Sequence, residues 1–275
     1  MAGSTRCSVH RLRITKGSDG SLVPNDKNTT IESTGLRNDS NVMVKDLGPQ
    51  IAWRTVFIVE YLGPLLIHPI IYALRPYIYT LPPFSVTIVP PASDLQKLSL
   101  ACICLNFVKR ELETLFVHRF SIATMPAYII IKNSAHYWLL AGLNIAYFTY
   151  SPTSPTQKNS ITDPLSLIGL GLFVIGELAN IQTHLTLRNL RSEGTTERGI
   201  PKGLGFNIVT CPNYMFEIMA WLGIWMINRS WSTLVFIVVA VIQMIIWAKK
   251  KERKYRKEFG DKYKKKRFTM IPGIV

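Results

Sequence analysis

Long apolar runs are the feature that most constrains how this chain can fold. Residues 51–74, 206–227 and 231–248 are predominantly apolar, and each run is long enough to cross the hydrocarbon core of a bilayer as a helix. We expect six spans, near 51–74, 95–120, 137–150, from 165 onward, 206–227 and 231–248, and a seventh could lie among residues 120–135. Backbone polar groups inside lipid must be hydrogen-bonded within their own segment. The prediction is therefore an all-α, polytopic membrane protein of six or seven transmembrane helices.

The charge distribution predicts the side of the membrane on which the chain ends. The formal net charge is +15, and residues 249–267 hold twelve Lys/Arg against three acidic residues. Such a run would favour nucleic-acid binding in a soluble protein. Here it directly follows an apolar run, which favours a juxtamembrane cytosolic tail. We therefore expect a basic cytosolic C-terminal tail, no nucleic-acid partner and, with six spans, a cytosolic N-terminus.

Three regions follow from the composition. Residues 1–45 are polar and poor in aromatics, which predicts a flexible or weakly folded segment without a core. Residues 46–248 hold the expected spans, and residues 249–275 form the basic tail. The four cysteines have neither zinc-ligand spacing nor a paired secretory pattern. We therefore expect no metal site, and polar parts that lie in a reducing compartment.

A polar stripe follows the fourth apolar run. Its five residues are spaced by 3, 4, 4 and 3 positions and so share one face of a helix: Glu177, Asn180, His184, Arg188 and Arg191. Ionisable groups at membrane depth are costly and commonly line a site. The stripe therefore predicts the polar wall of a cavity that holds a charged ligand. The alternative is a helix that leaves the bilayer with a solvated face.

Other ionisable residues lie among apolar ones. Glu60 is near the centre of the first run, where a lone carboxylate is costly unless it is protonated or paired. It is either a site residue or the structural partner of a buried Arg or His. Lys109 and Glu113 form an i,i+4 pair in the second helix. His118 and Arg119 follow between hydrophobic residues, so a solvated helix end explains this segment only in part.

Six motifs occur in a fixed order along residues 44–272. They are VKDLGPQIAWRTVFIVEYLGPLLIHP (44–69), KRELETLFVHRFSIATMP (109–126), KNSAHYW (132–138), NIQTHLTLRNLR (180–191), NIVTCPNYMFE (207–217) and the tail from 247 to 272. Together they closely resemble the very-long-chain trans-2-enoyl-CoA reductases of the endoplasmic reticulum, within the steroid 5-alpha-reductase superfamily. The resemblance implies a multi-pass protein of the endoplasmic reticulum membrane, whose membrane-embedded pocket faces the cytosol.

The resemblance also implies a reaction and the residues that carry it. The reaction would be the NADPH-dependent reduction of a very-long-chain trans-2-enoyl-CoA, the last step of each fatty-acyl elongation cycle. Membrane lipids and other elongation-cycle enzymes would be its further partners. The catalytic pair would be Tyr214, as proton donor, and Glu60. The cofactor-binding positions would be Asn180, His184, Arg188, Arg191, Arg198, Asn213, Arg253 and Tyr255, and the substrate-binding positions Glu113, His118 and Arg119.

Two features depart from the family pattern. Glu252 stands where most members have a histidine, which leaves a cofactor contact there open. Members also usually begin with a ubiquitin-like domain, and we expect this domain to be shortened, diverged or lost in residues 1–45. Two other classes of function stay open from the residues alone. One is a related membrane enzyme, either a sterol or steroid reductase or an isoprenylcysteine-type methyltransferase that would consume S-adenosylmethionine. The other is a non-catalytic scaffold for an elongation complex.

The predicted topology can be tested with a tag placed after Val275. In sealed microsomes, we expect protease to remove this tag, because the basic run should keep the C-terminus in the cytosol. A lumenal marker protein serves as the control for sealed membranes. A tag that stays protected would reverse the orientation. With the C-terminus in the cytosol, the sequon Asn228-Arg229-Ser230 should face the lumen, and we expect it to be unmodified because it lies so close to two spans.

Overall fold

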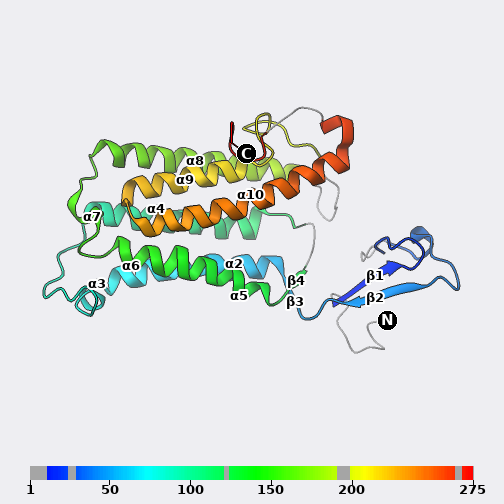
Figure 1. Cartoon of the computed structure of the whole chain (residues 1–275), viewed down its shortest axis with the longest axis horizontal. Coiled ribbons are helices and arrows are strands. Elements are labelled where there is room, and N and C mark those ends of the chain that lie inside the picture. Colours follow the sequence, from blue (N-terminus) through cyan, green and yellow to red (C-terminus); the bar gives the residue numbers. More distant parts are fainter. Residues whose placement is uncertain (1–10, 24–28, 121–123, 191–198, 264–267, 275) are drawn as a thin grey trace.

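Long helices packed side by side make up most of the protein, as the computed structural model shows (Figure 1). It describes residues 11–23, 29–120, 124–190, 199–263 and 268–274. The helices are η2 (Glu32–Thr34), α2 (Trp53–Ala73), α3 (Arg75–Ile78), α4 (Asp94–Leu112), η3 (Glu113–Val117), α5 (Ile129–Ala135), η4 (His136–Asn144), α6 (Ile145–Thr149), α7 (Pro155–Lys158), α8 (Pro164–Asn189), α9 (Pro212–Asn228), α10 (Trp231–Phe259) and η5 (Gly260–Tyr263). The strands are β1 (Leu12–Lys16), β2 (Val42–Asp46), β3 (Gln50–Ala52) and β4 (Thr124–Pro126).

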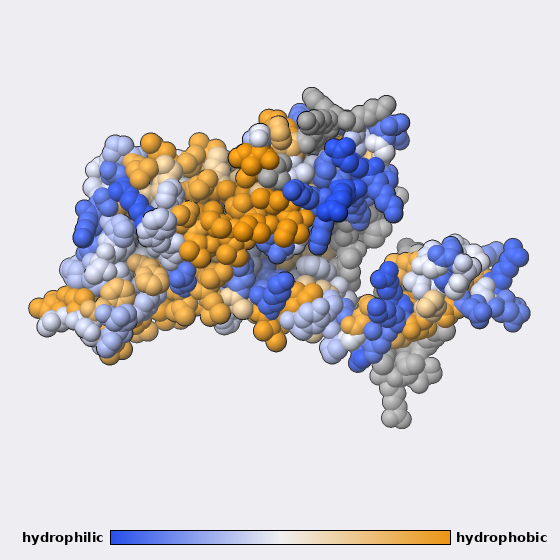
Figure 2. Space-filling model, viewed as in Figure 1, coloured by the Kyte–Doolittle hydropathy of each residue, from blue (hydrophilic) through white to orange (hydrophobic). Residues whose placement is uncertain are grey.

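Several of these helices have the character of membrane spans. Within the described residues, α2, α8 and the stretch Trp231–Tyr263, which contains α10, are long and apolar enough to cross a membrane. Apolar side chains form a broad band across the helices, with polar groups towards both ends (Figure 2). These features confirm a helical protein with membrane-spanning segments. The number of spans stays a prediction.

Three expected helix boundaries differ in the structure. The fifth helix, expected from residue 206, begins at Pro212, and residues 206–211 form a loop. α5, η4 and α6 follow one another without a gap from Ile129 to Thr149, so residues 129–135 extend the third helix and do not form a separate one. Lys132 and Asn133 continue this helix because each keeps the backbone N–H that proline would remove. α10 likewise passes from its apolar half into the basic run without a break, so the tail begins as a helical extension.

The closest helix pair is α8 and α9, whose backbones touch through small residues. A Cβ atom on Gly169 would lie 2.7 Å from the carbonyl oxygen of Gly223, and one on Gly176 would lie 2.6 Å from the backbone nitrogen of Ala220. Small residues at such positions allow membrane helices to approach closely. The antiparallel contact therefore brings the end of α8, which carries the predicted polar stripe, beside the start of α9.

The main hydrophobic core lies between α2, α4, η4, α8, α9 and α10. Its largest members are Tyr61, Phe107, Phe173, Trp221 and Phe236, all of which are buried. Phe107 is within ring-contact distance of three of its neighbours, with centroids 6.0 Å apart for Trp221 and 6.4 Å apart for Tyr61. This aromatic layer supports the inner side of the polar residues that follow on α4 and α9.

The N-terminal region is a small two-stranded sheet. β1 and β2 pair antiparallel, from Leu12 opposite Asp46 to Lys16 opposite Val42. In the part of the chain that the structure describes, Val56 is the first buried hydrophobic residue, so this sheet has no hydrophobic core of its own. The region is thus more regular than a flexible segment but lacks a core, and its origin from a ubiquitin-like domain stays a prediction.

The sequon at the end of α9 is packed into the protein. Asn228 is buried, and its side-chain amide donates a hydrogen bond to Thr233 Oγ1 at 2.7 Å. The side-chain oxygen Oδ1 of Asn228 accepts a hydrogen bond from the backbone nitrogen of Ser230 at 3.0 Å. A side chain held on both sides in this way supports the expectation that Asn228 carries no glycan.

The contact between α8 and α9 predicts opposite effects for two neighbouring glycines. Gly169→Ala should destabilise the protein by about 1–3 kcal/mol, because the new methyl group meets backbone that cannot yield locally. Gly171→Ala on the same helix should be neutral or stabilising by about 0.5–1 kcal/mol, because nothing lies near its added methyl group. The measurement is the thermal unfolding midpoint of each variant in detergent. Equal midpoints for the two variants would contradict the close contact.

Candidate active site

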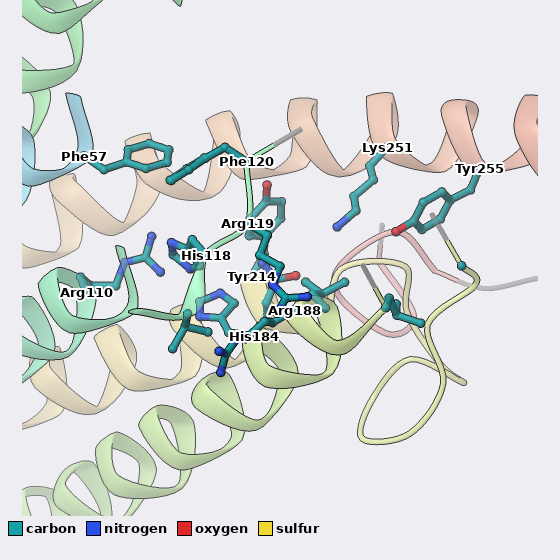
Figure 3. Close-up of a pocket in the computed structure, with 15 residues that line it drawn as sticks. Phe57, Arg110, His118, Arg119, Phe120, His184, Arg188, Tyr214, Lys251 and Tyr255 are labelled. Carbon is teal, nitrogen blue, oxygen red and sulfur yellow. The ribbon is translucent and has the colours of Figure 1, made fainter. Parts of the chain in front are cut away.

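A cavity of about 260 Å³ lies where α8 ends, α9 begins and the basic extension of α10 starts (Figure 3). It is lined by Phe57, Arg110, Val117, His118, Arg119, Phe120, His184, Leu187, Arg188, Leu190, Gly199, Asn213, Tyr214, Lys251 and Tyr255. One part of this wall is apolar and aromatic, and the other carries cations and a phenol. Such a mixture suits a ligand that joins an apolar chain to an anionic group.

Seven of the predicted site residues line this cavity. They are His118, Arg119, His184, Arg188, Asn213, Tyr214 and Tyr255. They come from the loop after η3, from α8, from the first turn of α9 and from the extension of α10. The polar stripe of α8 therefore faces the interior along most of its length, and the alternative of a wholly solvated helix face does not describe it.

The other predicted residues lie outside the cavity lining. Glu60 and Asn180 are buried behind it, and Glu113 contacts it through His184. Arg253 is exposed on the extension of α10. Arg191 and Arg198 lie outside the described residues, so their predicted contacts stay predictions.

Glu113 organises the part of the cavity that carries the histidines. It begins η3, a π-helical turn that continues α4, and such turns re-aim side chains and are frequent at functional sites. His184 Nδ1 lies 2.8 Å from Glu113 Oε1, and Arg110 Nη1 donates to Glu113 Oε2 at 3.4 Å. Because the carboxylate accepts, Nδ1 of His184 carries the proton of this hydrogen bond.

The same residues raise the question of a metal centre. The ligand atoms of Glu113, His118 and His184 all lie within 4.8 Å of one another. Glu113, however, is already bonded to His184 and to Arg110, whose guanidinium would repel a divalent cation. We therefore interpret the three residues as a hydrogen-bonded group beside the cavity.

His118 contributes a second ring to this group. It lies in extended conformation after the end of η3. Its ring centroid is 5.0 Å from that of His184, with the planes nearly perpendicular. Both imidazole rings line the cavity.

A buried ammonium ties three helices together behind the cavity. Lys109 Nζ lies 2.8 Å from Glu177 Oε2, 3.8 Å from Glu217 Oε2 and 3.9 Å from Glu113 Oε2. It also donates to Asn180 Oδ1 at 2.6 Å. These partners come from α8, α9 and η3, so one cation fixes the relative position of the elements that carry the site.

Asn180 connects Lys109 to the start of α9. Its Nδ2 donates to the backbone oxygen of Asn213 at 2.7 Å, which holds the first turn of α9 against α8. Asn213 Oδ1 is buried and has no hydrogen-bond partner in the described structure, although the residue lines the cavity. A buried acceptor without a partner is costly, so this oxygen is suited to a donor on a bound ligand.

Tyr214 occupies the next position of the same turn. It is half-buried in the cavity wall, and its ring lies 6.4 Å from that of Trp247 on α10. Arg110, Arg188 and Lys251 line the same cavity, so the phenol faces a cationic surrounding (Figure 3). Glu60, its predicted partner, lies on α2, and Glu60 Oε2 has no hydrogen-bond partner in the described residues. The pairing of these two residues stays a prediction.

Two cavity cations were missed by the sequence analysis. Arg110 Nη2 donates to Tyr61 OH at 2.6 Å, and its guanidinium lies over the same ring, 4.9 Å from the centroid. The sequence signal for Arg110 was its position next to Lys109, in a helix whose residues change from apolar to polar. Lys251 was hidden among the twelve cations of the basic run, and only its i,i+4 relation to Tyr255 distinguished it.

Comparison with known proteins identifies the family. Residues 123–275 match the family model described as 3-oxo-5-alpha-steroid 4-dehydrogenase. A very-long-chain enoyl-CoA reductase of Dictyostelium discoideum is 41% identical over 100% of this chain and 89% of its own. A probable very-long-chain enoyl-CoA reductase of Caenorhabditis elegans is 38% identical over 89% of this chain and 79% of its own. Because the family model covers more than half of the chain and these relatives cover nearly all of it, the chain belongs to the very-long-chain enoyl-CoA reductase family, within the 3-oxo-5-alpha-steroid 4-dehydrogenase group.

Proposed function

We propose that this protein reduces a very-long-chain trans-2-enoyl-CoA to the saturated acyl-CoA with NADPH, in the last step of fatty-acid elongation. The proposed place is the endoplasmic reticulum membrane, with six spans and with the cavity and the C-terminus facing the cytosol. The observation that carries the proposal is Tyr214, a phenol held among cations in a cavity of a chain whose relatives are named enoyl-CoA reductases.

The cavity residues fit a nicotinamide dinucleotide. The buried and unpartnered Asn213 Oδ1 offers an acceptor of the kind that a carboxamide N–H₂ requires. Arg188, Arg119 and Lys251 offer cations for diphosphate and 2′-phosphate oxygens, and a guanidinium fork can bind such groups with two hydrogen bonds. When bound, the cofactor supplies the hydride that the β-carbon of the substrate receives.

The chain itself contributes the proton and the charge stabilisation. Addition of hydride at the β-carbon places enolate charge on the thioester oxygen, and fixed donors in a dry site stabilise such charge. Arg110 is the proposed donor, because its contacts with Tyr61 and Glu113 hold the guanidinium rigidly at the cavity wall. Tyr214 then delivers its hydroxyl proton to the α-carbon, which completes the saturated product.

The apolar part of the cavity wall suits the acyl chain. Phe57 and Phe120 lie with ring centroids 5.5 Å apart, and both line the cavity together with Val117. Phe57 belongs to α2, one of the helices with the character of a membrane span. An acyl chain that leaves the cavity along this side would continue into apolar surroundings, whereas the cationic side would hold the nucleotide groups.

The description of the family model as a steroid dehydrogenase supports one alternative substrate, a 3-oxo-4-ene steroid. The two classes are distinguished by the oxidation of NADPH, followed by absorbance, with either a trans-2-enoyl-CoA or such a steroid. We expect oxidation with the enoyl-CoA only. Oxidation with the steroid alone would assign the protein to the other branch of the group.

A preference for NADPH over NADH tests the cationic wall. Arg188→Gln should raise the KM for NADPH roughly tenfold to a hundredfold, because a charge-assisted hydrogen bond contributes about 1.5–3 kcal/mol. The KM for NADH should change little if Arg188 binds the 2′-phosphate. Arg13→Gln, at an exposed position of β1, is the matched control. Equal kcat/KM for the two cofactors in the wild-type protein would contradict this assignment.

The role of Tyr214 is tested by removing its hydroxyl group alone. Tyr214→Phe keeps the ring against Trp247, so protein yield and NADPH binding should be nearly unchanged. Single-turnover reduction of a saturating enoyl-CoA should slow by about 10²–10⁴. Tyr77→Phe, at a highly exposed tyrosine, is the control. A rate within about threefold of wild type would remove Tyr214 from the mechanism.

The predicted partnership of Glu60 with Tyr214 has its own test. Glu60→Gln replaces a buried carboxylate with an amide of nearly the same shape, and we expect it to slow the single turnover as well. If the two residues act as a unit, the double variant should lose less than the sum of the single losses, expressed as activation free energies. Additive losses would show that Glu60 acts independently, as a structural residue of α2.

A further inference from the structure

The side chain of Glu252 is buried, although most of its neighbours on the extension of α10 are exposed. Thr210 Oγ1 donates a hydrogen bond to Glu252 Oε2, and Tyr263 OH donates to the same oxygen at 3.1 Å. Arg256 Nε donates to Glu252 Oε1 at 2.8 Å, one helical turn further on. We call these four residues the Glu252 cluster. The carboxylate points to these partners, and Glu252 is not among the residues that line the cavity.

The Glu252 cluster joins three segments that are distant in sequence. Thr210 belongs to the loop before α9, Glu252 to α10 and Tyr263 to the end of η5. Backbone hydrogen bonds reinforce the junction, since the nitrogens of Thr210 and Cys211 donate to the carbonyl oxygens of Phe268 and Thr269 at 2.9 and 3.0 Å. The chain after η5 thus returns to the loop before α9 and closes the junction from a third side.

The Glu252 cluster lies directly behind two walls of the cavity. Lys251 precedes Glu252 and Tyr255 follows it by three residues, and both side chains face the cavity from α10 (Figure 3). Asn213 and Tyr214 follow Thr210 within four residues on the opposite wall. The wall on α9 has a second support, because Asn180 holds the backbone of Asn213. On α10, Ala248 packs with Cys211 and Ile218 in a buried apolar cluster, and the Glu252 cluster adds a polar contact beside Lys251 and Tyr255.

We propose that Glu252 is a positioning residue that holds Lys251 and Tyr255 at the correct distance from α9 for binding of the nucleotide cofactor. It acts through Thr210 and Tyr263 and does not touch the cofactor. This inference rests on the proposed use of NADPH. It also assigns a role to the position at which this chain departs from the family pattern, where an internal carboxylate cluster takes the place of the expected cofactor contact.

The test compares three variants of the full-length protein in detergent. Glu252→Ala removes the carboxylate, and Glu252→Gln keeps an oxygen that can accept from Thr210 and Tyr263. Glu258→Ala removes an exposed carboxylate from the same helix and is the matched control. Two quantities are measured for each variant. The first is the pair of kcat and KM for NADPH at saturating enoyl-CoA, and the second is the hydrogen exchange of the amides in residues 208–211 and 268–270.

For Glu252→Ala we expect the KM for NADPH to rise about tenfold, a change equivalent to about 1.4 kcal/mol. The kcat should stay within about threefold of wild type, because Asn180 still holds the turn that carries Tyr214. Exchange in both segments should become faster. Glu252→Gln should show smaller changes in the same direction, and Glu258→Ala none.

A purely structural role gives a different pattern. If Glu252→Ala only lowered the folded fraction, the apparent kcat would fall while the KM for NADPH stayed at the wild-type value, and that result would overturn the proposal. Unchanged exchange in both segments would overturn it as well. If the wild-type protein does not oxidise NADPH at all, the proposed function fails. The exchange measurement then still decides whether Glu252 holds the three segments together.

Discussion

The relative positions of α4, α8 and α9 beside the cavity depend on one largely buried cation. The side chain of Lys109 is 11% exposed, and it lies within 4.0 Å of carboxylate oxygens from η3, α8 and α9. A lone ammonium at this depth would be strongly unfavourable, and three carboxylates without it would repel one another. Lys109 and its partners are therefore stable only together, and their common arrangement fixes how α4, α8 and α9 meet.

His184 and the first turn of α9 each lie one contact away from this arrangement. Glu113 joins the cation to His184, and Asn180 joins it to the first turn of α9, which carries Tyr214. The glycine contacts between α8 and α9 make these short connections possible, since larger residues at Gly169 or Gly176 would separate the backbones. Polar pairing and close helix packing thus position the same few side chains.

The sequence predicted those parts of the site that depend on one helix. The spacing of Glu177, Asn180 and His184 placed all three on one face, and the structure shows that face directed inward. Helical periodicity is a local property, so it can be read from the sequence without knowing which residues the helix contacts. The apolar runs predicted the long helices for the same reason, except at two starts. The third helix begins earlier, at Ile129, because polar residues concealed its continuation, and the fifth begins at Pro212 instead of residue 206.

The remaining parts depend on contacts between distant segments. The local signal for Arg110 is weak, and its contact with Tyr61, 49 positions earlier in the chain, shows that the guanidinium is fixed at the cavity. Glu252 likewise looked like one acid in a basic run, because its partners Thr210 and Tyr263 come from other segments. Tertiary contacts of this kind have no periodic signature in the sequence.

The size of the cavity explains why the basic extension must belong to the same helix as the last span. About 260 Å³ is less than the range of about 300–1,000 Å³ typical of ligand pockets, so a dinucleotide and an acyl-CoA must both extend beyond it. Their phosphates need cations at a fixed distance from the reacting carbons. A flexible tail would have to be ordered at each binding event, at a cost in conformational entropy. In α10, the helical phase already places Lys251 and Tyr255 on the cavity side, so the unbroken helix provides this order before either ligand binds.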